Sequence, residues 1–518
     1  MSGPEGAPGP GPGSGRPPAG SPRRGEPTPP ISLGADPGAA TAHLLGTRRE
    51  LSAGLLSRLD AACAEVVTDV ATRAEASRDW WPLGMHWALD GEVAALAGAV
   101  CRPESAREVA DVLRACHDDT VPVTAAGGRS GVCGASVPLH GGVLLDLTAL
   151  DGIVEVDSTS MVVDVRPGTF GDVLEDELRD AYGMTVGHWP QSIQLSTVGG
   201  WLACRSAGQM SNRYGKIEDI VLGLDVALAD GRLVSTGGLA RAATGPDLTQ
   251  LFVGSEGTLG IIVGARLALH PAPGAPATAA FGFESFTAAN DACRRILQRG
   301  AAPAVLRTYD EVEADRSFST GELSVLLVRD EGDPRLVDAT RLVVAEECAT
   351  ADPLDDALVD QWWAHRNDVS ALEALTIRGW VVDTMEMTVR WGDLERVYRD
   401  VREALRSVDA VTVASAHQSH AYGSGSCLYF TFAGKPPPNG RESTYVAAWD
   451  AGTRAALAAG ASLSHHHGVG LNRSRFVREA LGPAFGVLEA VKGSIDPRGI
   501  LNPGKLGLPD PFGEVHWP

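Results

Sequence analysis

Positive charge is scarce in this sequence. Its 518 residues include 44 Lys and Arg against 65 Asp and Glu, which leaves a net charge of −21. Because nucleic-acid affinity at physiological salt comes largely from clusters of Lys and Arg, this deficit argues against a broad phosphate-binding face. We therefore expect no nucleic-acid partner.

Long apolar runs and clustered cysteines are lacking as well. No uncharged apolar stretch approaches the ~20 residues that span a bilayer, and the N-terminus has no apolar signal-peptide core. We therefore expect a soluble, cytoplasmic protein. The eight cysteines form no CxxC pair, which favours reduced, buried thiols, although an even count also permits disulfides.

The length of the chain predicts two or more packed domains. Of the first 38 residues 21 are Gly or Pro, so residues 1–40 are predicted to form a disordered tail, either a spacer or a proline-rich ligand. Residues 41–92 are predicted to be an N-terminal helical segment, because leucines recur on one helical face. This segment ends in three tryptophans that either pack in the core or stack on a ligand, Trp80, Trp81 and Trp87.

A glycine-rich loop follows a predicted helix and strand. Ser105 is a candidate helix cap, residues 121–123 form a short apolar strand, and the loop AAGGRSGVCG occupies residues 125–134 before a strand at 143–147. Successive glycines let backbone N–H groups converge on an anion. The loop contains neither GxxxxGK[ST] nor a GxGxxG that opens a helix, so neither a P-loop nor a Rossmann site is supported, and a plain turn remains an alternative.

Two further glycine segments strengthen the case for a phosphate cradle. They occupy residues 187–220 and 252–262, and between them a strand–turn–strand signal has Asp230 and Gly231 at its turn. The order GGRSG, STVGG, NRYGKIED, GSEGTLGII resembles the FAD-binding domain of the vanillyl-alcohol oxidase and p-cresol methylhydroxylase flavoproteins. The phrase DPRGILNPGK at 496–505 is similar to the closing, flavin-side segment of that family.

The resemblance implies an α+β fold with two domains. A p-cresol methylhydroxylase-type FAD-binding domain is expected at 93–272, and a cap of the FAD-linked oxidase C-terminal type at 273–490. Residues 491–518 would return to the flavin side. The cap should contain an antiparallel sheet with strands at 323–329, 380–389 and 426–432 and a covering helix at 393–407, and the site should lie between the domains.

The resemblance also assigns the cofactor and the residues that hold it. An acidic protein can hold the FAD diphosphate through backbone amides and local dipoles, which glycine loops supply. Residues 124–134 contain no histidine and Cys133 is expected to be a packing residue, so the FAD should be non-covalent. The expected cofactor residues are Thr124, Ala125, Ala126, Gly127, Gly128, Arg129, Ser130, Gln191, Ser192, Ile193, Gln194, Leu195, Ser196, Thr197, Gly199, Gly200, Cys204, Arg205, Ser206, Ala207, Glu256, Gly257, Thr258, Leu259, Gly260, Ile261 and Ile262.

Within this superfamily, four segments are similar to the alkyldihydroxyacetonephosphate synthases, which exchange an acyl for an alkyl group without net oxidation. They are residues 190–201, the segment around Arg307, the strand around Tyr429 and the run HHHGVG. The resemblance implies that Tyr429, Arg307 and the three histidines are catalytic and that Arg366 binds the substrate phosphate. The histidines are His465, His466 and His467.

Chemical reasoning about these residues adds two expectations. In a strand His465 and His467 would share one face, and no cysteine or carboxylate in that stretch completes a tetrahedral set, so no metal is expected, with a solvated turn as the alternative. Tyr429 should share a strand face with Thr431, and its pKa would have to be lowered by cations such as Arg307 for it to act as a base.

Several departures keep other functions open. Residues 368–390 match weakly, His417 stands where the synthases more often have arginine, and no peroxisomal tripeptide is present. An FAD-linked D-2-hydroxy acid dehydrogenase for lactate or glycolate is the alternative enzyme, and a flavin-binding module without chemistry is a third hypothesis. The expected partner is a small lipid or hydroxy-acid substrate. By analogy a homodimer stays open, as does peripheral membrane contact.

Overall fold

The computed structural model describes residues 31–34, 36–44, 46–513 and 515. Most of the predicted tail, residues 1–30 and 35, lies outside them. For its last part the prediction is wrong, because Ile31 and Leu33 are 2% and 1% exposed and pack with Trp80 and Met85 in one apolar cluster. The packed chain therefore starts before residue 41.

The N-terminal segment is not continuously helical. It contains α1 (Ala53–Ala62), β2 (Glu65–Val67), α2 (Val70–Ala76) and α3 (Pro82–Leu89), with β1 (Thr41–Ala42) and β3 (Glu92–Val93) as a small parallel pair. The helical prediction fails at residues 65–67 because Val66 and Val67 pair with Cys101 and Val100 of the neighbouring strand. Trp81 packs in the core and donates from Nε1 to the hydroxyl of Tyr445 at 3.0 Å, which supports the packing role.

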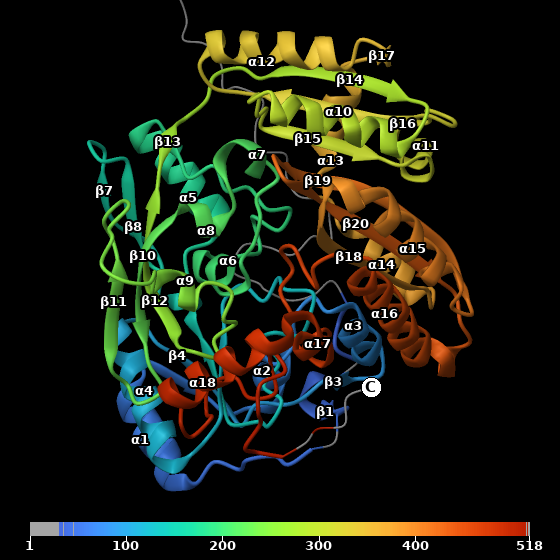
Figure 1. Cartoon of the computed structure of the whole chain (residues 1–518). Helices are drawn as coiled ribbons and strands as arrows, with labels where there is room; N and C mark the ends of the chain where they lie inside the picture. Colours follow the sequence, from blue (N-terminus) through green and yellow to red (C-terminus); the bar gives the residue numbers. More distant parts are fainter. Residues whose placement is uncertain (1–30, 35, 45, 514, 516–518) are drawn as a thin grey trace, which may run out of the picture.

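Two sheets form the predicted FAD-binding domain, at the left and bottom of Figure 1. The first has the order β2-β4-β6-β5, with β4, β6 and β5 parallel, and α4 lies beside it, capped by Ser105 as predicted. The second is antiparallel in the order β11-β10-β12-β8-β7. The bounds are β4 (Ala99–Arg102), α4 (Ala106–Asp119), β5 (Val123–Ala126), β6 (Val143–Asp146), β7 (Ile153–Asp157), β8 (Val162–Val165), α5 (Gly171–Glu177), β9 (Met184–Thr185), α6 (Val198–Cys204), α7 (Ser211–Tyr214), α8 (Ile217–Ile220), β10 (Val221–Ala227), β11 (Leu233–Gly237), α9 (Thr249–Phe252), β12 (Ile261–Ala268) and β13 (His270–Pro271).

The cap is built on a seven-stranded antiparallel sheet in the order β17-β14-β16-β15-β19-β20-β18, which runs from the top to the right of Figure 1. The predicted strands at 323–329, 380–389 and 426–432 and the helix at 393–407 are all present. The bounds are β14 (Ala277–Phe283), α10 (Phe286–Gln298), β15 (Val305–Tyr309), α11 (Glu311–Phe318), β16 (Ser324–Asp330), α12 (Pro334–Glu347), β17 (Asp352–Leu354), α13 (Ala357–His365), α14 (Ser370–Ile377), β18 (Val381–Arg390), α15 (Leu394–Arg406), β19 (Val411–Tyr422), β20 (Gly425–Gly434) and α16 (Arg441–Ala458).

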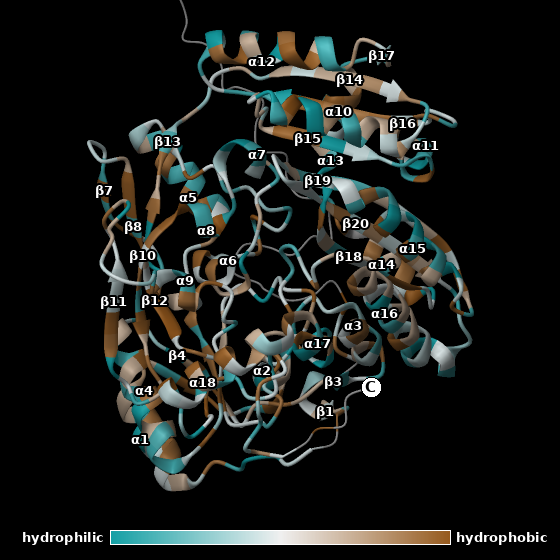
Figure 2. Ribbon diagram, viewed as in Figure 1, coloured by the Kyte–Doolittle hydropathy of each residue, from teal (hydrophilic) through white to brown (hydrophobic). Residues whose placement is uncertain are grey.

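Strand alternation separates the two faces of the cap sheet. Leu428, Phe430 and Phe432 of β20 are fully buried with apolar side chains of α15 and α16, and hydrophilic residues of α15 lie on its outer side (Figure 2). Tyr429 and Thr431 therefore face the other way, as the alternation predicts. This second face of the sheet is left to form a site.

The C-terminal segment returns to the FAD-binding domain after α17 (Val477–Leu481) and α18 (Phe485–Ile495). Val123 N donates to Ile500 O, and Asn502 N donates to Val123 O, each at 2.8 Å, so the segment lies directly beside β5. The eight cysteines all have free thiols, and seven are buried. Among the described residues, no helix combines the length and apolar character needed to cross a membrane.

Candidate active site

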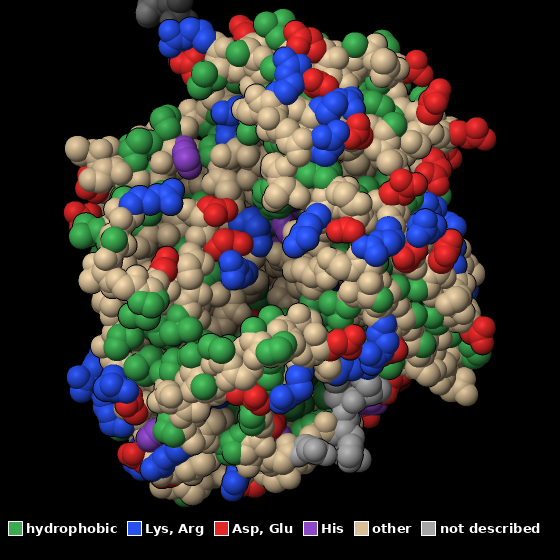
Figure 3. Space-filling view, viewed as in Figure 1, with side chains coloured by type: hydrophobic (Ala, Val, Ile, Leu, Met, Phe, Trp, Pro, Cys, Tyr) green, Lys and Arg blue, Asp and Glu red, His purple; other side chains and the backbone are tan. Residues whose placement is uncertain are grey.

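A cavity of about 650 Å³ lies between the two domains. The surface is hollowed near the centre of Figure 3, with Lys and Arg side chains at the rim. The three predicted glycine segments and the cap sheet all reach this cavity. The predicted residues on its wall are Ala125, Ala126, Gly127, Gly128, Arg129, Ser130, Gln191, Ser192, Leu195, Ser196, Thr197, Gly199, Gly200, Cys204, Ser206, Ala207, Glu256, Gly257, Gly260, Ile261, Ile262, Arg307, Arg366, Tyr429, His466 and His467.

Seven predicted residues are not on the wall, namely Thr124, Ile193, Gln194, Arg205, Thr258, Leu259 and His465. Their surroundings explain this. Ile193 and Leu259 are buried in the core of the FAD-binding domain, and Gln194 points to solvent. The hydroxyl of Thr124 bonds to Asn502, and Arg205 pairs with Glu218 outside the cavity. In a run of consecutive residues only some side chains point toward the cavity. A prediction that takes every residue of a motif therefore includes residues that do not line the cavity.

The residues on the wall fit FAD. The loop 125–131 supplies backbone N–H groups with little side-chain obstruction, as an anion cradle requires. Arg129 lines the cavity in a left-handed conformation (φ 52°) and donates from Nη1 to Asp146 at 3.3 Å, so a fixed cation lies beside this cradle. The cavity thus offers backbone N–H groups and a guanidinium where a diphosphate would bind.

Close packing of the first two glycine segments predicts the effect of one methyl group. A Cβ on Gly128 would lie 1.8 Å from the carbonyl oxygen of Leu195, whereas a Cβ on Gly131 in the same loop would come no closer than 3.8 Å to its nearest neighbour, Asp79. Forcing the segments apart costs about 1–3 kcal/mol or more, so we expect Gly128→Ala to bind FAD at least about fivefold more weakly. FAD titration of the apoprotein measures this, and Gly131→Ala is the matched control. Equal affinity of Gly128→Ala and wild type would contradict the packing argument.

Polar side chains form a row across four neighbouring strands of the cap. Tyr309 of β15 lies opposite His417 of β19, His417 opposite Tyr429 of β20, and Tyr429 opposite Glu386 of β18. Directly opposite residues of antiparallel strands share a face, and Arg307 joins this face two residues before Tyr309. The sheet register therefore brings predicted catalytic groups from distant parts of the chain together.

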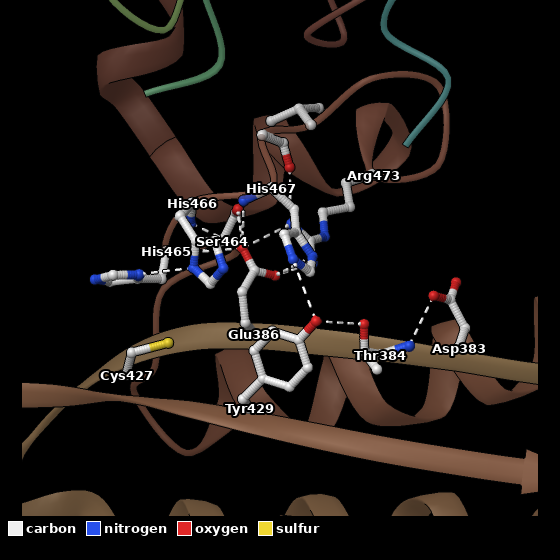
Figure 4. A network of polar contacts seen from close by, with 12 residues as sticks. Asp383, Thr384, Glu386, Cys427, Tyr429, Ser464, His465, His466, His467 and Arg473 are labelled. Atoms are coloured by element: carbon white, nitrogen blue, oxygen red, sulfur yellow. Dashed lines mark hydrogen bonds and ion pairs between the residues drawn. The ribbon is translucent and has the colours of Figure 1, made fainter. Parts of the chain in front are cut away.

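Tyr429 is hydrogen-bonded on both sides (Figure 4). Its hydroxyl accepts from Thr384 Oγ1 at 3.0 Å and lies 3.4 Å from His467 Nε2, to which it can donate. Burial raises the pKa of Tyr429, and Glu386 and Asp383 raise it further. The predicted lowering of this pKa by cations is therefore wrong, because desolvation outweighs the field of Arg307. Tyr429 is a neutral phenol at neutral pH.

The histidine run lies on a bend and not in a strand, so the expected alternation of its side chains is wrong. Instead, Glu386 Oε1 accepts from the backbone N–H groups of His465, His466 and His467 at 3.1, 2.9 and 2.7 Å. Arg473, which is fully buried, donates to the same carboxylate. A buried ion pair thus holds the bend and its three imidazoles.

The three imidazoles are neutral at neutral pH. Burial lowers the pKa of His465 to about 3, lowers that of His466 well below its usual range, and also lowers that of His467, against the opposing effect of Glu386. A neutral imidazole has one ring nitrogen that accepts a proton. His467 Nδ1 lies 3.5 Å from Glu386 Oε2, so a proton arriving at His467 would meet a carboxylate.

One histidine that the sequence did not single out completes a nitrogen-rich group. His420, His465 and His466 each offer a ring nitrogen within 4.8 Å of the others, a set that could ligate a metal ion. His420 Nδ1 bonds to Ser211 Oγ and His465 Nε2 to the hydroxyl of Tyr422, each at 2.8 Å. Residues 464–470 alone offer no tetrahedral ligand set, but His420 of β19 lies far from them in the sequence and adds a third ring nitrogen to those of His465 and His466.

Arg366 lies on the cavity wall, but the protein already engages its guanidinium. The group stacks on Trp363 at 3.5 Å and donates to the Trp363 carbonyl, and burial with nearby Arg329 lowers its pKa to about 10. Its predicted contact with substrate phosphate stays a prediction. No sequence motif indicated a role for Glu386 or Arg473, since neither lies in one. Only strand pairing reveals the position of Glu386 opposite Tyr429.

Comparison with known proteins supports the family that these features indicate. Residues 97–237 match the FAD binding domain family, and residues 272–506 match the C-terminal domain of FAD linked oxidases. The chain is 30% identical over 454 residues to the alkyldihydroxyacetonephosphate synthase of Dictyostelium discoideum, covering 80% of this chain and 74% of the relative. It is 27% identical over 430 residues to glycolate oxidase subunit GlcD of Bacillus subtilis, covering 80% and 89%.

A solved structure of an alkyldihydroxyacetonephosphate synthase superimposes with a TM-score of 0.75 at 25% identity, covering 92% of this chain and 90% of that one. The predicted two-domain α+β fold, with an FAD-binding domain and an FAD-linked oxidase cap, is confirmed. The predicted cofactor is confirmed as FAD. The chain belongs to the FAD-linked oxidase family, as a member similar to the alkyldihydroxyacetonephosphate synthases.

Proposed function

We propose that this FAD-dependent enzyme is an alkyldihydroxyacetonephosphate synthase, which exchanges the acyl group of acyl-dihydroxyacetone phosphate for a fatty alcohol. The observation that carries the proposal is Tyr429, held between Thr384 and His467 on the wall of the same cavity as Arg307. Apolar side chains of the cap also line this cavity and suit a lipid chain: Trp362, Val369, Leu372, Leu375 and Val382.

The reaction needs proton movement without net oxidation. One proton leaves C1 of the substrate and later returns, and the C1–O bond to the fatty carboxylate breaks. A C1–O bond to the alcohol forms as the alcohol loses its hydroxyl proton, which leaves with the fatty carboxylate. Bound FAD supplies the reactive ring system. Tyr429 would accept the C1 proton on its oxygen as it passes its own proton to His467 Nε2, 3.4 Å away, and Glu386 would stabilise the resulting imidazolium.

Anionic groups of the substrate call for fixed cations nearby. Arg307 would hold the leaving carboxylate, since a hydrogen bond between a guanidinium and a carboxylate is assisted by both charges. Arg366, on the same cavity wall, would contribute to phosphate binding. FAD would bind without a covalent link, because Cys133 is buried away from the cavity wall and burial raises its pKa well above the usual value.

An FAD-linked D-2-hydroxy acid dehydrogenase is the second candidate. It is favoured by the group His420, His465 and His466, which could hold a divalent cation against a hydroxy acid, and by the similarity to glycolate oxidase subunit GlcD. In that case Arg307 would bind the substrate carboxylate and a neutral histidine would take the hydroxyl proton. A cytoplasmic location and a homodimer remain proposals for both candidates.

An anaerobic spectrum separates the two candidates. The holoenzyme is mixed with palmitoyl-dihydroxyacetone phosphate and then hexadecanol, or separately with D-lactate or D-glycolate. For the synthase we expect a partial flavin change that the alcohol reverses, with release of palmitate and no electron uptake. Full bleaching of the flavin by a hydroxy acid, with no response to the acyl ketone, would contradict the synthase and establish the dehydrogenase.

A further inference from the structure

Helix α11 places a buried carboxylate behind the row of polar side chains. Glu313, 3% exposed on α11, lies 2.8 Å through Oε2 from His417 Nδ1, and Ser415 Oγ donates to its other oxygen at 2.9 Å. On the opposite side of the imidazole, Arg307 Nη2 lies 2.7 Å from His417 Nε2. Three charged or polar groups thus form one chain that ends on the cavity wall.

The protonation states in this chain follow from its hydrogen bonds. Burial, followed by the charge of Arg307, lowers the pKa of His417 to about 4. Burial raises the pKa of Glu313, but the interactions with His417 and Arg316 outweigh burial and lower this pKa to about 2. At neutral pH the carboxylate accepts from the Nδ1–H group, which leaves the Nε2 lone pair to accept from the guanidinium. The order of donors and acceptors therefore runs one way, from Arg307 through His417 to Glu313.

His417 also touches the second predicted catalytic group. Its ring stacks on Tyr429 with a centroid distance of 4.6 Å and an interplanar angle of 19°. Arg307 has one further anchor, because its Nε donates to the hydroxyl of Tyr309 at 2.7 Å. These contacts engage Nε and Nη2, so Nη1 is the nitrogen available for a ligand in the cavity.

We infer that Glu313 and His417 are positioning residues that hold Arg307 to bind the carboxylate of the substrate. The inference rests on the proposed function only in taking Arg307 as the anion site, which both candidate reactions require. Neither residue needs to touch the substrate. Because two of the three guanidinium nitrogens of Arg307 are held by Tyr309 and His417, the orientation of this guanidinium determines the affinity for a carboxylate.

Variants of the FAD-loaded protein test this role. His417→Leu removes the acceptor for Arg307 and the partner of Glu313, Glu313→Gln removes only the charge, and Arg316→Gln is the control. Arg316 approaches Glu313 from the solvent side at 3.5 Å and is 53% exposed. The probe is 2-hydroxyisobutyrate, a carboxylate without a Cα hydrogen, whose binding is followed by the change in the visible FAD spectrum. KM and kcat are then measured with whichever substrate is turned over.

We expect His417→Leu to bind the probe about tenfold to 100-fold more weakly, and Glu313→Gln about threefold to tenfold, because the lost contacts involve a charged group. KM should rise by similar factors, with kcat changing less than about threefold, and Arg316→Gln should match wild type. FAD content and melting temperature identify any general loss of structure. Wild-type probe affinity in a well-folded His417→Leu variant would overturn the inference, as would a wild-type protein that shows no probe binding.

The same data distinguish failure of this inference from failure of the proposed function. If the acyl ketone is not turned over while probe binding follows the expected order of variants, the synthase proposal fails and the positioning role stands. If the acyl ketone is turned over and His417→Leu keeps a wild-type KM, the synthase stands and the positioning role fails.

Discussion

Replacing Tyr429 with phenylalanine is expected to lower turnover by about 100-fold to 10,000-fold, the usual contribution of a positioned general acid–base group. The phenol lies on the cavity wall and is hydrogen-bonded to the neutral imidazole of His467, and Phe removes that hydrogen bond while keeping the ring against His417. FAD content should be unchanged, because the change deletes only one hydroxyl. Turnover under saturating substrate, with the flavin spectrum as a check on loading, measures the effect.

Thr384→Val is the matched control for this prediction. It removes the hydrogen bond that Thr384 donates to the same hydroxyl at 3.0 Å but leaves the contact of Tyr429 with His467. We expect a loss of less than about tenfold, the value of one neutral hydrogen bond. If Tyr429→Phe keeps full turnover with FAD bound, the proposed proton path through His467 is wrong.

Removing the buried carboxylate of Glu386 should have the largest effect on stability. Glu386→Ala leaves Arg473 as an uncompensated charge at a site where both side chains are fully buried, and it also deprives three backbone N–H groups of their acceptor. Breaking a buried pair from one side typically costs about 3–5 kcal/mol of unfolding free energy. Chemical denaturation of the holoenzyme should show this loss, together with loss of activity, because the histidine bend loses its anchor.

Two further variants test whether the loss of stability comes from an unpaired buried charge. Glu489→Ala removes a partner of Arg478 at 2.8 Å, but that guanidinium is 66% exposed, so we expect a change below about 1 kcal/mol. Replacing Glu386 and Arg473 together by Leu and Met should cost less than Glu386→Ala alone, because no unpaired charge remains. A double variant that is no more stable than Glu386→Ala would show that the ion pair itself does not dominate the loss.

Local patterns predicted a large part of the fold. The alternation in residues 426–432 correctly separated Tyr429 from Leu428 and Phe430, because one face of a half-buried strand must be apolar. The apolar spacing after Ser105 correctly predicted a capped helix. The same approach failed at residues 65–67, where two valines inside a predicted helical segment pair with a strand instead. Short segments carry too little periodic signal to outweigh tertiary pairing.

The features of the candidate site also fall into two groups, those that local sequence predicts and those that depend on the tertiary structure. Local residue types indicated glycine loops that could hold an anion, and the order of these motifs indicated FAD through its resemblance to known flavoproteins. Strand register places Tyr429 between His417 and Glu386. Burial raises the pKa of Tyr429 and keeps the imidazole of His466 neutral. Desolvation and cross-strand contact depend on residues tens to hundreds of positions apart, so only the tertiary structure could establish the electrostatics of this site.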